Sequence, residues 1–214
     1  MLTKSESITI SSGPLALEAV LTPGQGPTPS ALVVVCHPHP LYGGDMDSHV
    51  VRAICREMHR QNVATLRFNF RGVGQSQGTY DGGKGEPYDL GAALSRAEEL
   101  QNIDPDRIGV VGYSFGAGVA IAVAAGDTRV KALAAISAPV VGLSSDDLQC
   151  YQGPTLLASG SNDQFAPSEK MQELAKSLGS RGKCLILEGE DHFWGLRVEE
   201  MAQAVAEFFA AHLL

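Results

Sequence analysis

Ser114 lies at the centre of the pentapeptide Gly-Tyr-Ser-Phe-Gly at residues 112–116, and its hydroxyl could act as a nucleophile. An apolar stretch precedes the pentapeptide and an alanine- and glycine-rich stretch follows it, so a buried strand is expected to turn directly into a helix. A serine on such a tight turn has a strained backbone, and side chains larger than glycine at 112 and 116 would collide. The spacing therefore predicts that the turn presents the Ser114 hydroxyl above a sheet.

A serine nucleophile needs a base, and the base needs an acid to orient it. Two histidines, His192 and His212, lie downstream of Ser114. His212 falls in a predicted terminal helix, where a favourable interaction with the helix dipole explains it better. His192 follows the last predicted strand and is our candidate base. Asp163, in the segment 160–167 directly after another predicted strand, is our candidate acid.

Other interpretations of the acidic residues stay open. An aspartate in such a loop commonly forms an Asx-turn or caps a helix, so Asp163 could have that structural role instead. Asp191 adjoins His192, and its side chain is expected to point elsewhere. Asp146 and Asp147 follow the sixth predicted strand and are the reserve candidates for the acid.

The stretch at 36–49 contains three histidines and two aspartates within fourteen residues, a density typical of metal sites. A zinc or iron site, however, needs three or four ligands that converge, with partners behind them. His49 is expected on a helix capped by Ser48, facing away from the strand end at which His37 and His39 lie. The prolines and glycines of the stretch favour a loop that is first extended and then turns, so we expect no metal.

Hydrophobic patterns predict strands that alternate with helices along most of the chain. An opening antiparallel hairpin and continuous apolar runs after it indicate an α/β fold: a mostly parallel central sheet of about eight strands, with helices on both faces. Residues 1–214 are expected to form a single domain, with its chemistry beyond the carboxyl ends of the strands. The predicted strands are 7–11, 15–21, 31–36, 63–68, 107–113, 131–137, 154–159 and 183–187, and the predicted helices are 49–60, 87–100, 115–125, 168–178 and 198–212.

The composition narrows the classes of function. A chain of 214 residues with 44% hydrophobic residues and a formal charge of -8 is expected to pack well and to bind neither nucleic acid nor an anionic membrane. The first ten residues lack the apolar core of a signal peptide, and no apolar run reaches the roughly 18 residues of a membrane span. The four cysteines form no CxxC pair, so we expect reduced thiols and a cytoplasmic location.

Five segments together resemble the α/β-hydrolase superfamily, and they are CHPHPLYGG at 36–44, NFRGVGQSQG at 69–78, GYSFG at 112–116, GSNDQFAP at 160–167 and EDHFW at 190–194. The chain order of serine, aspartate and histidine also matches. The set is most similar to small bacterial serine hydrolases without a lid, relatives of the dienelactone hydrolases. Dienelactone hydrolases use a cysteine where this chain has Ser114, so the resemblance implies an esterase-like activity.

The resemblance also implies the α/β-hydrolase fold, and the chain leaves little room for a cap domain. Only about fifteen residues, 139–153, follow the sixth predicted strand, and they are expected to be irregular. The glycines of the segment 71–78 have the spacing G-x-G-x-x-x-G, whereas a dinucleotide-binding loop has G-x-G-x-x-G. The resemblance implies a structural turn there, with Arg71 fixing neighbouring loops by hydrogen bonds.

Attack on an acyl carbon creates an oxyanion that two backbone N–H groups should meet. The first is expected from Phe115, directly after the nucleophile. The second should come from the loop at 36–44, where the prolines cannot donate. His39 is the favoured donor, and Leu41 or Tyr42 are the alternatives.

We therefore expect a serine hydrolase that cleaves small carboxylic esters, with short acyl chains, and needs no cofactor or metal. A thioesterase or a small peptidase with the same triad is the alternative, as is a non-catalytic binding module. A monomer and a homodimer are both compatible with the sequence. The side chains expected to line the open acyl pocket are Leu41, Tyr42, Phe165, Phe193 and Trp194, besides Phe115.

Overall fold

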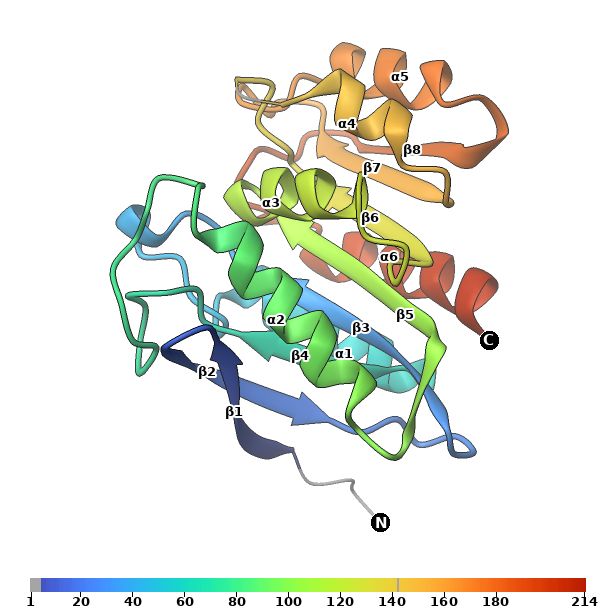
Figure 1. The fold of residues 1–214 in the computed structure, drawn as a ribbon. Coiled ribbons are helices and arrows are strands. Elements are labelled where there is room, and N and C mark those ends of the chain that lie inside the picture. Colours follow the sequence, from blue (N-terminus) through green and yellow to red (C-terminus); the bar gives the residue numbers. More distant parts are fainter. Residues whose placement is uncertain (1–4, 142) are drawn as a thin grey trace.

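A single eight-stranded sheet forms the centre of the molecule (Figure 1). The structure, a computed structural model, describes residues 5–141 and 143–214. The strands lie in the order β1-β2-β4-β3-β5-β6-β7-β8; β1 and β2 pair antiparallel, β2 joins β4 antiparallel, and the remaining pairs are parallel. The strands are β1 (Glu6–Ser12), β2 (Leu15–Thr22), β3 (Ser30–Cys36), β4 (Ala64–Phe68), β5 (Ile103–Tyr113), β6 (Ala132–Ile136), β7 (Thr155–Gly160) and β8 (Gly182–Leu187).

Helices cover both faces of the sheet, as the alternating pattern predicted (Figure 1). One apolar core holds the buried side chains of α2, α3, α4 and α5, and the other holds those of α1 and α6. The helices are α1 (His49–Arg60), α2 (Glu86–Glu98), α3 (Phe115–Ala124), α4 (Ser145–Cys150), α5 (Ser168–Ser177) and α6 (Val198–Leu213), with short 3-10 turns η1 (Pro40–Tyr42) and η2 (Gly179–Arg181). Within the residues described, no helix is long and apolar enough to cross a membrane.

The continuous apolar runs of the sequence form strands that are buried on both faces. All seven residues of β3 and all five of β6 are buried, because helices cover the sheet above and below them. In β1 and β2, near one edge of the sheet, buried positions alternate with more exposed ones. Alternation is the pattern of a strand covered on one face only, so the hairpin prediction is confirmed as well.

Two details of the structure differ from the sequence prediction. The segment 139–153, expected to be irregular, contains the short helix α4, whose Ser144 cap accepts a hydrogen bond from the Asp147 N–H at 3.0 Å. Ser48 precedes α1 as expected, but its hydroxyl makes no capping bond and lies buried without a hydrogen-bond partner. A backbone hydrogen bond stabilises the turn before α1 instead: the Ser48 N–H donates to the Asp45 carbonyl at 3.2 Å.

Arg71 fixes the turn after β4, in agreement with the role that the resemblance implied. Its guanidinium donates two hydrogen bonds to the carboxylate of Asp89 on α2, at 2.9 and 2.7 Å. Asp89 is fully buried and also accepts a bond from the Ser12 hydroxyl of β1, at 2.7 Å. A buried charge that is paired and fully hydrogen-bonded in this way holds its neighbours in one arrangement. The turn is thereby tied to α2 and to the hairpin.

The close approach of α3 to the sheet sets the position of everything at the carboxyl end of β5. A Cβ atom on Gly116 would lie 2.5 Å from the carbonyl oxygen of His37, at the end of β3. A Cβ on Gly112 would collide with the carbonyl group of Gly116 itself. Both obstacles are backbone atoms, which cannot rotate away as a side chain can. Glycine at both positions is therefore a steric requirement of the fold.

Replacing the two glycines of α3 one at a time tests this requirement. Gly116→Ala should lower the free energy of unfolding by about 2–3 kcal/mol, since the backbone of β3 must move. Gly118→Ala is the matched control on the same helix, because a Cβ there meets nothing within 4 Å. It should raise the free energy of unfolding by about 0.5–1 kcal/mol, the usual gain of alanine over glycine in a helix. Urea unfolding measures both, and similar effects of the two substitutions would contradict the steric account.

Candidate active site

Ser114 occupies the turn between β5 and α3 with a backbone that serine rarely adopts. Its φ is 54° and its ψ is -118°, in a region that is costly for a residue with a Cβ. The Ser114 N–H donates to the carbonyl of Ile136 on β6 at 2.9 Å, so the neighbouring strand holds the turn in place. The hydroxyl is left at the carboxyl edge of the sheet, beside the amino end of α3.

His192 lies in the loop between β8 and α6, and its ring stands between Ser114 and Asp163. Its Nε2 is 2.9 Å from the Ser114 Oγ, and its Nδ1 is 3.0 Å from each carboxylate oxygen of Asp163. All three residues are buried, so these contacts form away from bulk water. In this arrangement an imidazole can take a proton from a hydroxyl at one nitrogen while a carboxylate orients it through the other.

Asp163 follows β7, and its Oδ1 accepts the backbone N–H groups of Phe165 and Ala166, each at 2.9 Å. It therefore forms the Asx-turn left open from the sequence and contacts His192 at the same time. Burial by itself would raise the pKa of Asp163, but hydrogen bonds from His192, Ser137 and a backbone N–H outweigh it and hold the pKa below its usual value. The carboxylate thus stays charged beside the imidazole.

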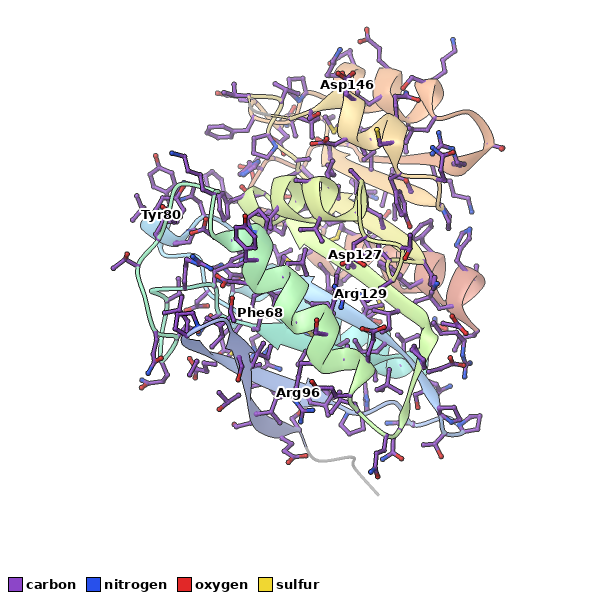
Figure 2. All side chains as sticks on the ribbon, in the orientation of Figure 1. Phe68, Tyr80, Arg96, Asp127, Arg129 and Asp146 are labelled. Atoms are coloured by element: carbon purple, nitrogen blue, oxygen red, sulfur yellow. The ribbon has the colours of Figure 1, made fainter. Side chains whose placement is uncertain are left out.

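The other acidic candidates do not reach the imidazole. Asp191 accepts the Phe193 N–H at 2.8 Å, whereas the imidazole of His192 contacts Asp163. The reserve candidates Asp146 and Asp147 lie in the first turn of α4, and Asp146 projects outward from that helix (Figure 2). The structure brings Asp163 to the histidine.

One of the three candidate donors in the loop after β3 keeps its N–H free of an acceptor among the described residues. Leu41 donates its N–H to His39 Nδ1 at 3.2 Å, and Tyr42 donates its N–H to the His39 carbonyl at 3.1 Å. Throughout residues 5–141 and 143–214, neither the His39 N–H nor the Phe115 N–H donates to a protein acceptor. Of the three candidates in the loop, His39 alone has its N–H available. The His39 ring packs on that of Phe115, with centroids 5.1 Å apart, so the two residues are neighbours.

The histidines of the 36–49 stretch have hydrogen-bonding roles. His37 is fully buried; its Nε2 accepts the Phe70 N–H at 3.0 Å, so its Nδ1 carries the proton and donates to the Pro38 carbonyl at 2.6 Å. His39 uses its Nδ1 for Leu41, and its Nε2 lies 3.0 Å from the hydroxyl of Tyr80. Tyr80 projects from the loop between β4 and α2 (Figure 2). Among the residues described, no group of three or more histidine, cysteine or acidic side chains could hold a metal ion.

Three further hydrogen bonds hold the His192 segment, and sequence reasoning missed all of them. The Tyr113 hydroxyl of β5 donates to the His192 carbonyl at 2.9 Å. His49 of α1 places its Nε2 2.9 Å from the Phe193 carbonyl. The Trp194 indole donates to the hydroxyl of Ser137 at 3.0 Å. Tyr113 belongs to the pentapeptide and could have been singled out, but no pattern links the other two partners to the loop.

Four of the side chains expected to line the acyl pocket are exposed, and one is buried. Leu41, Tyr42, Phe165 and Phe193 are all exposed, in loops beyond the carboxyl ends of β3, β7 and β8. Trp194 has 0% exposure, so the expectation that it lines the pocket is wrong. A left-handed backbone at Trp194, with φ 55°, turns the indole inward toward its partner, while the adjacent Phe193 faces outward.

A hollow of about 420 Å³ lies beside the site, between the segments 40–45 and 72–80. Tyr80 lines it and also packs against His39, with ring centroids 5.0 Å apart. Ser114 and His192 are not among the residues that line it. The hollow therefore lies next to Ser114 and His192 and does not contain them.

Residues 30–210 match the model of a family described as the alpha/beta hydrolase domain, and the chain belongs to that family. A serine-hydrolase homologue from Coxiella burnetii shares 33% identity, covers 94% of this chain and 96% of its own, and superposes with a TM-score of 0.84. A serine hydrolase without a lid from Xanthomonas campestris shares 25% identity over 100% of this chain and 97% of its own, with a TM-score of 0.86. An uncharacterised protein of Rickettsia prowazekii is 32% identical over 83% of this chain and 77% of its own length.

These likenesses settle the fold and the broad class. The eight-stranded, mostly parallel sheet with helices on both faces is the α/β-hydrolase fold, and the part of the chain that the structure describes has no lid, like the Xanthomonas protein. The prediction of a small, lidless member of this superfamily is confirmed. Membership supports a hydrolase activity.

The buried imidazole of His37 predicts how stability depends on pH. Burial lowers the pKa of His37 to about 4, whereas in the unfolded chain the pKa is near 6.5. Between those values the unfolded state binds a proton that the folded state does not, so the free energy of unfolding falls as the pH drops from about 6.5 to 4, by roughly 3 kcal/mol for this group. Urea unfolding at pH 7 and pH 4.5 should show less of this loss in His37→Gln, which keeps an acceptor for the Phe70 N–H but does not titrate. Equal losses in the two proteins would contradict the assignment.

Proposed function

We propose that this protein is a serine hydrolase that cleaves carboxylic esters through a Ser114–His192–Asp163 triad. The observation that carries the proposal is the buried series of contacts from the Ser114 Oγ to the His192 Nε2, at 2.9 Å, and from the His192 Nδ1 to Asp163, at 3.0 Å. A module that only binds ligands has no need of a strained serine aligned with an imidazole and a carboxylate.

The geometry supports a two-step reaction. The His192 Nε2 removes the hydroxyl proton as the Ser114 Oγ attacks the ester carbonyl carbon, and Asp163 stabilises the resulting imidazolium. The tetrahedral intermediate expels the alcohol, which takes the proton from His192 and leaves an acyl group on the Ser114 oxygen. Water, deprotonated by the same imidazole, then attacks the acyl carbon. The bond between that carbon and the Ser114 Oγ breaks, the Oγ takes the proton back from His192, and the carboxylic acid is released.

The N–H groups of Phe115 and His39 are the proposed donors to the oxyanion. Neither donates to an acceptor within residues 5–141 and 143–214, and the ring contact makes the two residues neighbours, which supports a shared role at one oxygen. Phe115 is also the first residue of α3, where the helix dipole favours negative charge. If the N–H of Leu41 or Tyr42 served the oxyanion, a hydrogen bond that holds the loop would be broken. Use of the His39 N–H breaks no such bond.

The open surface around Ser114 supports small substrates with short acyl chains. Leu41, Tyr42, Phe165 and Phe193 offer apolar contact on the rim but do not enclose a deep tunnel. The same attack would open a thioester or a peptide bond, so a thioesterase or small peptidase with this triad is the alternative. The protein is proposed to act as one domain, as a monomer or a homodimer.

Reaction with a fluorophosphonate probe tests the nucleophile. The probe should label the wild-type protein at Ser114, and Ser114→Ala should abolish the labelling and reduce kcat for 4-nitrophenyl butyrate on the order of 10⁵-fold. Ser180→Ala is the matched control, because Ser180 is an exposed serine in η2, at the opposite end of the β8 strand from the His192 loop. Labelling that persists in Ser114→Ala, or is lost in Ser180→Ala, would count against the assignment.

Acyl-chain preference tests the open pocket. With 4-nitrophenyl esters kept below their aggregation limits, kcat/KM should fall from four-carbon to twelve-carbon chains by about tenfold or more, equivalent to about 1.4 kcal/mol in the activation free energy. The reason is that a long chain leaves most of its length in water on a rim that cannot surround it. Equal or faster turnover of the twelve-carbon ester would refute the short-chain proposal.

A further inference from the structure

The loop that carries His39 extends into solvent, and Tyr42 at its tip is 87% exposed. Throughout the described residues, the segment 38–45 makes a single hydrogen bond to a residue outside 37–48. That bond joins the His39 ring to the Tyr80 hydroxyl, at 3.0 Å. The position of His39 therefore depends on Tyr80.

The hydrogen bonds of the His39 ring have a fixed direction. Its Nδ1 accepts the Leu41 N–H at 3.2 Å, so this nitrogen carries no proton. The ring proton is then on Nε2, which donates to the Tyr80 hydroxyl oxygen. The imidazole is thus held on one side by its own loop and on the other side by Tyr80.

The backbone of His39 leaves one polar group without a partner. The carbonyl accepts the N–H groups of Tyr42 and Gly44, each at 3.1 Å. The N–H has no acceptor among the residues described. Because the carbonyl and both ring nitrogens are bonded, the orientation of the residue is fixed, and with it the direction in which the N–H points.

Tyr80 is itself held in place. It projects from the loop between β4 and α2 (Figure 2), and Glu86 at the start of α2 holds the residues that follow it. The Glu86 carboxylate is fully buried and accepts the N–H groups of Asp81 and Gly83, each at 2.8 Å. Tyr80 can therefore act as an anchor for a loop that has no other.

Three aromatic rings meet at the proposed oxyanion site. The ring centroids of His39 and Tyr80 are 5.0 Å apart, those of His39 and Phe115 are 5.1 Å apart, and those of Tyr80 and Phe115 are 5.7 Å apart. His39 and Phe115 carry the two proposed N–H donors. Tyr80 is thus in contact with both residues.

We propose that Tyr80 is a positioning residue for the oxyanion. Its hydroxyl holds the His39 ring and thereby keeps the His39 N–H directed at the oxygen that becomes negatively charged when Ser114 attacks. The inference deepens the proposed function and rests on it for the role of the His39 N–H.

Tyr80→Phe tests the proposal, because it keeps the ring contacts and removes the acceptor of the His39 Nε2–H. A poorly placed donor stabilises the transition state less, so kcat for 4-nitrophenyl butyrate should fall by about threefold to tenfold, with little change in KM. A residue that only filled space would not separate kcat from KM in this way.

Inhibition by 1-butaneboronic acid should weaken in Tyr80→Phe by a similar factor. The boron bonds to the Ser114 Oγ, whose proton passes to His192, and one oxygen of the tetrahedral boronate then occupies the oxyanion position. Tyr88→Phe is the matched control, since Tyr88 is a tyrosine of α2 that is 75% exposed. It should leave both kcat and the inhibition unchanged.

A double-mutant cycle tests whether Tyr80 acts through the imidazole. His39→Phe keeps the backbone N–H and an aromatic ring but has no ring nitrogen, and it should lower kcat at least as much as Tyr80→Phe. In the His39→Phe background, Tyr80→Phe should have no further effect, since the bond is already absent. Additive effects in the cycle, or wild-type kcat and inhibition in Tyr80→Phe, would overturn the proposal.

Nitrogen NMR of the histidine rings tests the bond without any catalytic assay. At mildly alkaline pH the His39 ring, identified by its missing signals in His39→Phe, should carry its proton on Nε2. The Nε2 resonance should shift in Tyr80→Phe but not in Tyr88→Phe. A proton on Nδ1, or an unchanged Nε2 resonance in Tyr80→Phe, would overturn the proposal even in an active enzyme. The expected resonances in a protein that hydrolyses no ester would instead refute the proposed function.

Discussion

Direct contact between α3 and the backbone at the end of β3 is the constraint on which the site depends. This contact holds Ser114, between Tyr113 and Phe115, in a backbone conformation that serine tolerates poorly. No side chain separates the two elements at Gly116. This contact brings the first turn of α3 and the loop that begins at His37 to the same point in space. Ser114, the N–H groups of Phe115 and His39, and the end of β3 are thus placed by one close approach, and a larger residue at position 116 would separate all of them.

The remaining groups reach that point through loops, and loops need anchors of their own. The His192 segment is held by one hydrogen bond to α1, one from β5 and one to the residue after β6, so three separate elements contribute to the position of one imidazole. Asp163 is held by its own turn and by the imidazole. Rigid placement by several elements is what lets an uncovered site keep a defined geometry.

The fold was largely predictable because its strands bury both faces. A continuous apolar run such as 31–36, in a chain where strands alternate with helices, indicates a strand that is covered on both faces. The loops that follow such strands contain the candidate residues Ser114, Asp163 and His192. The short helix α4 was missed because six residues with one buried leucine leave no periodic signal. Trp194 was misplaced because a pattern cannot tell which of two adjacent aromatic residues turns inward; that choice depends on a backbone angle and on a hydroxyl 57 positions away in the chain.

The location of the single tryptophan gives this protein a built-in optical reporter. An indole in a dry, hydrogen-bonded setting fluoresces at shorter wavelength than one in water, and here all of the tryptophan emission arises next to His192. If the loop after β8 loosened, the emission would therefore shift to longer wavelength. The far-ultraviolet circular dichroism would not change as long as the sheet stayed folded. Comparison of the two signals during unfolding would distinguish the opening of this one loop from the unfolding of the whole structure.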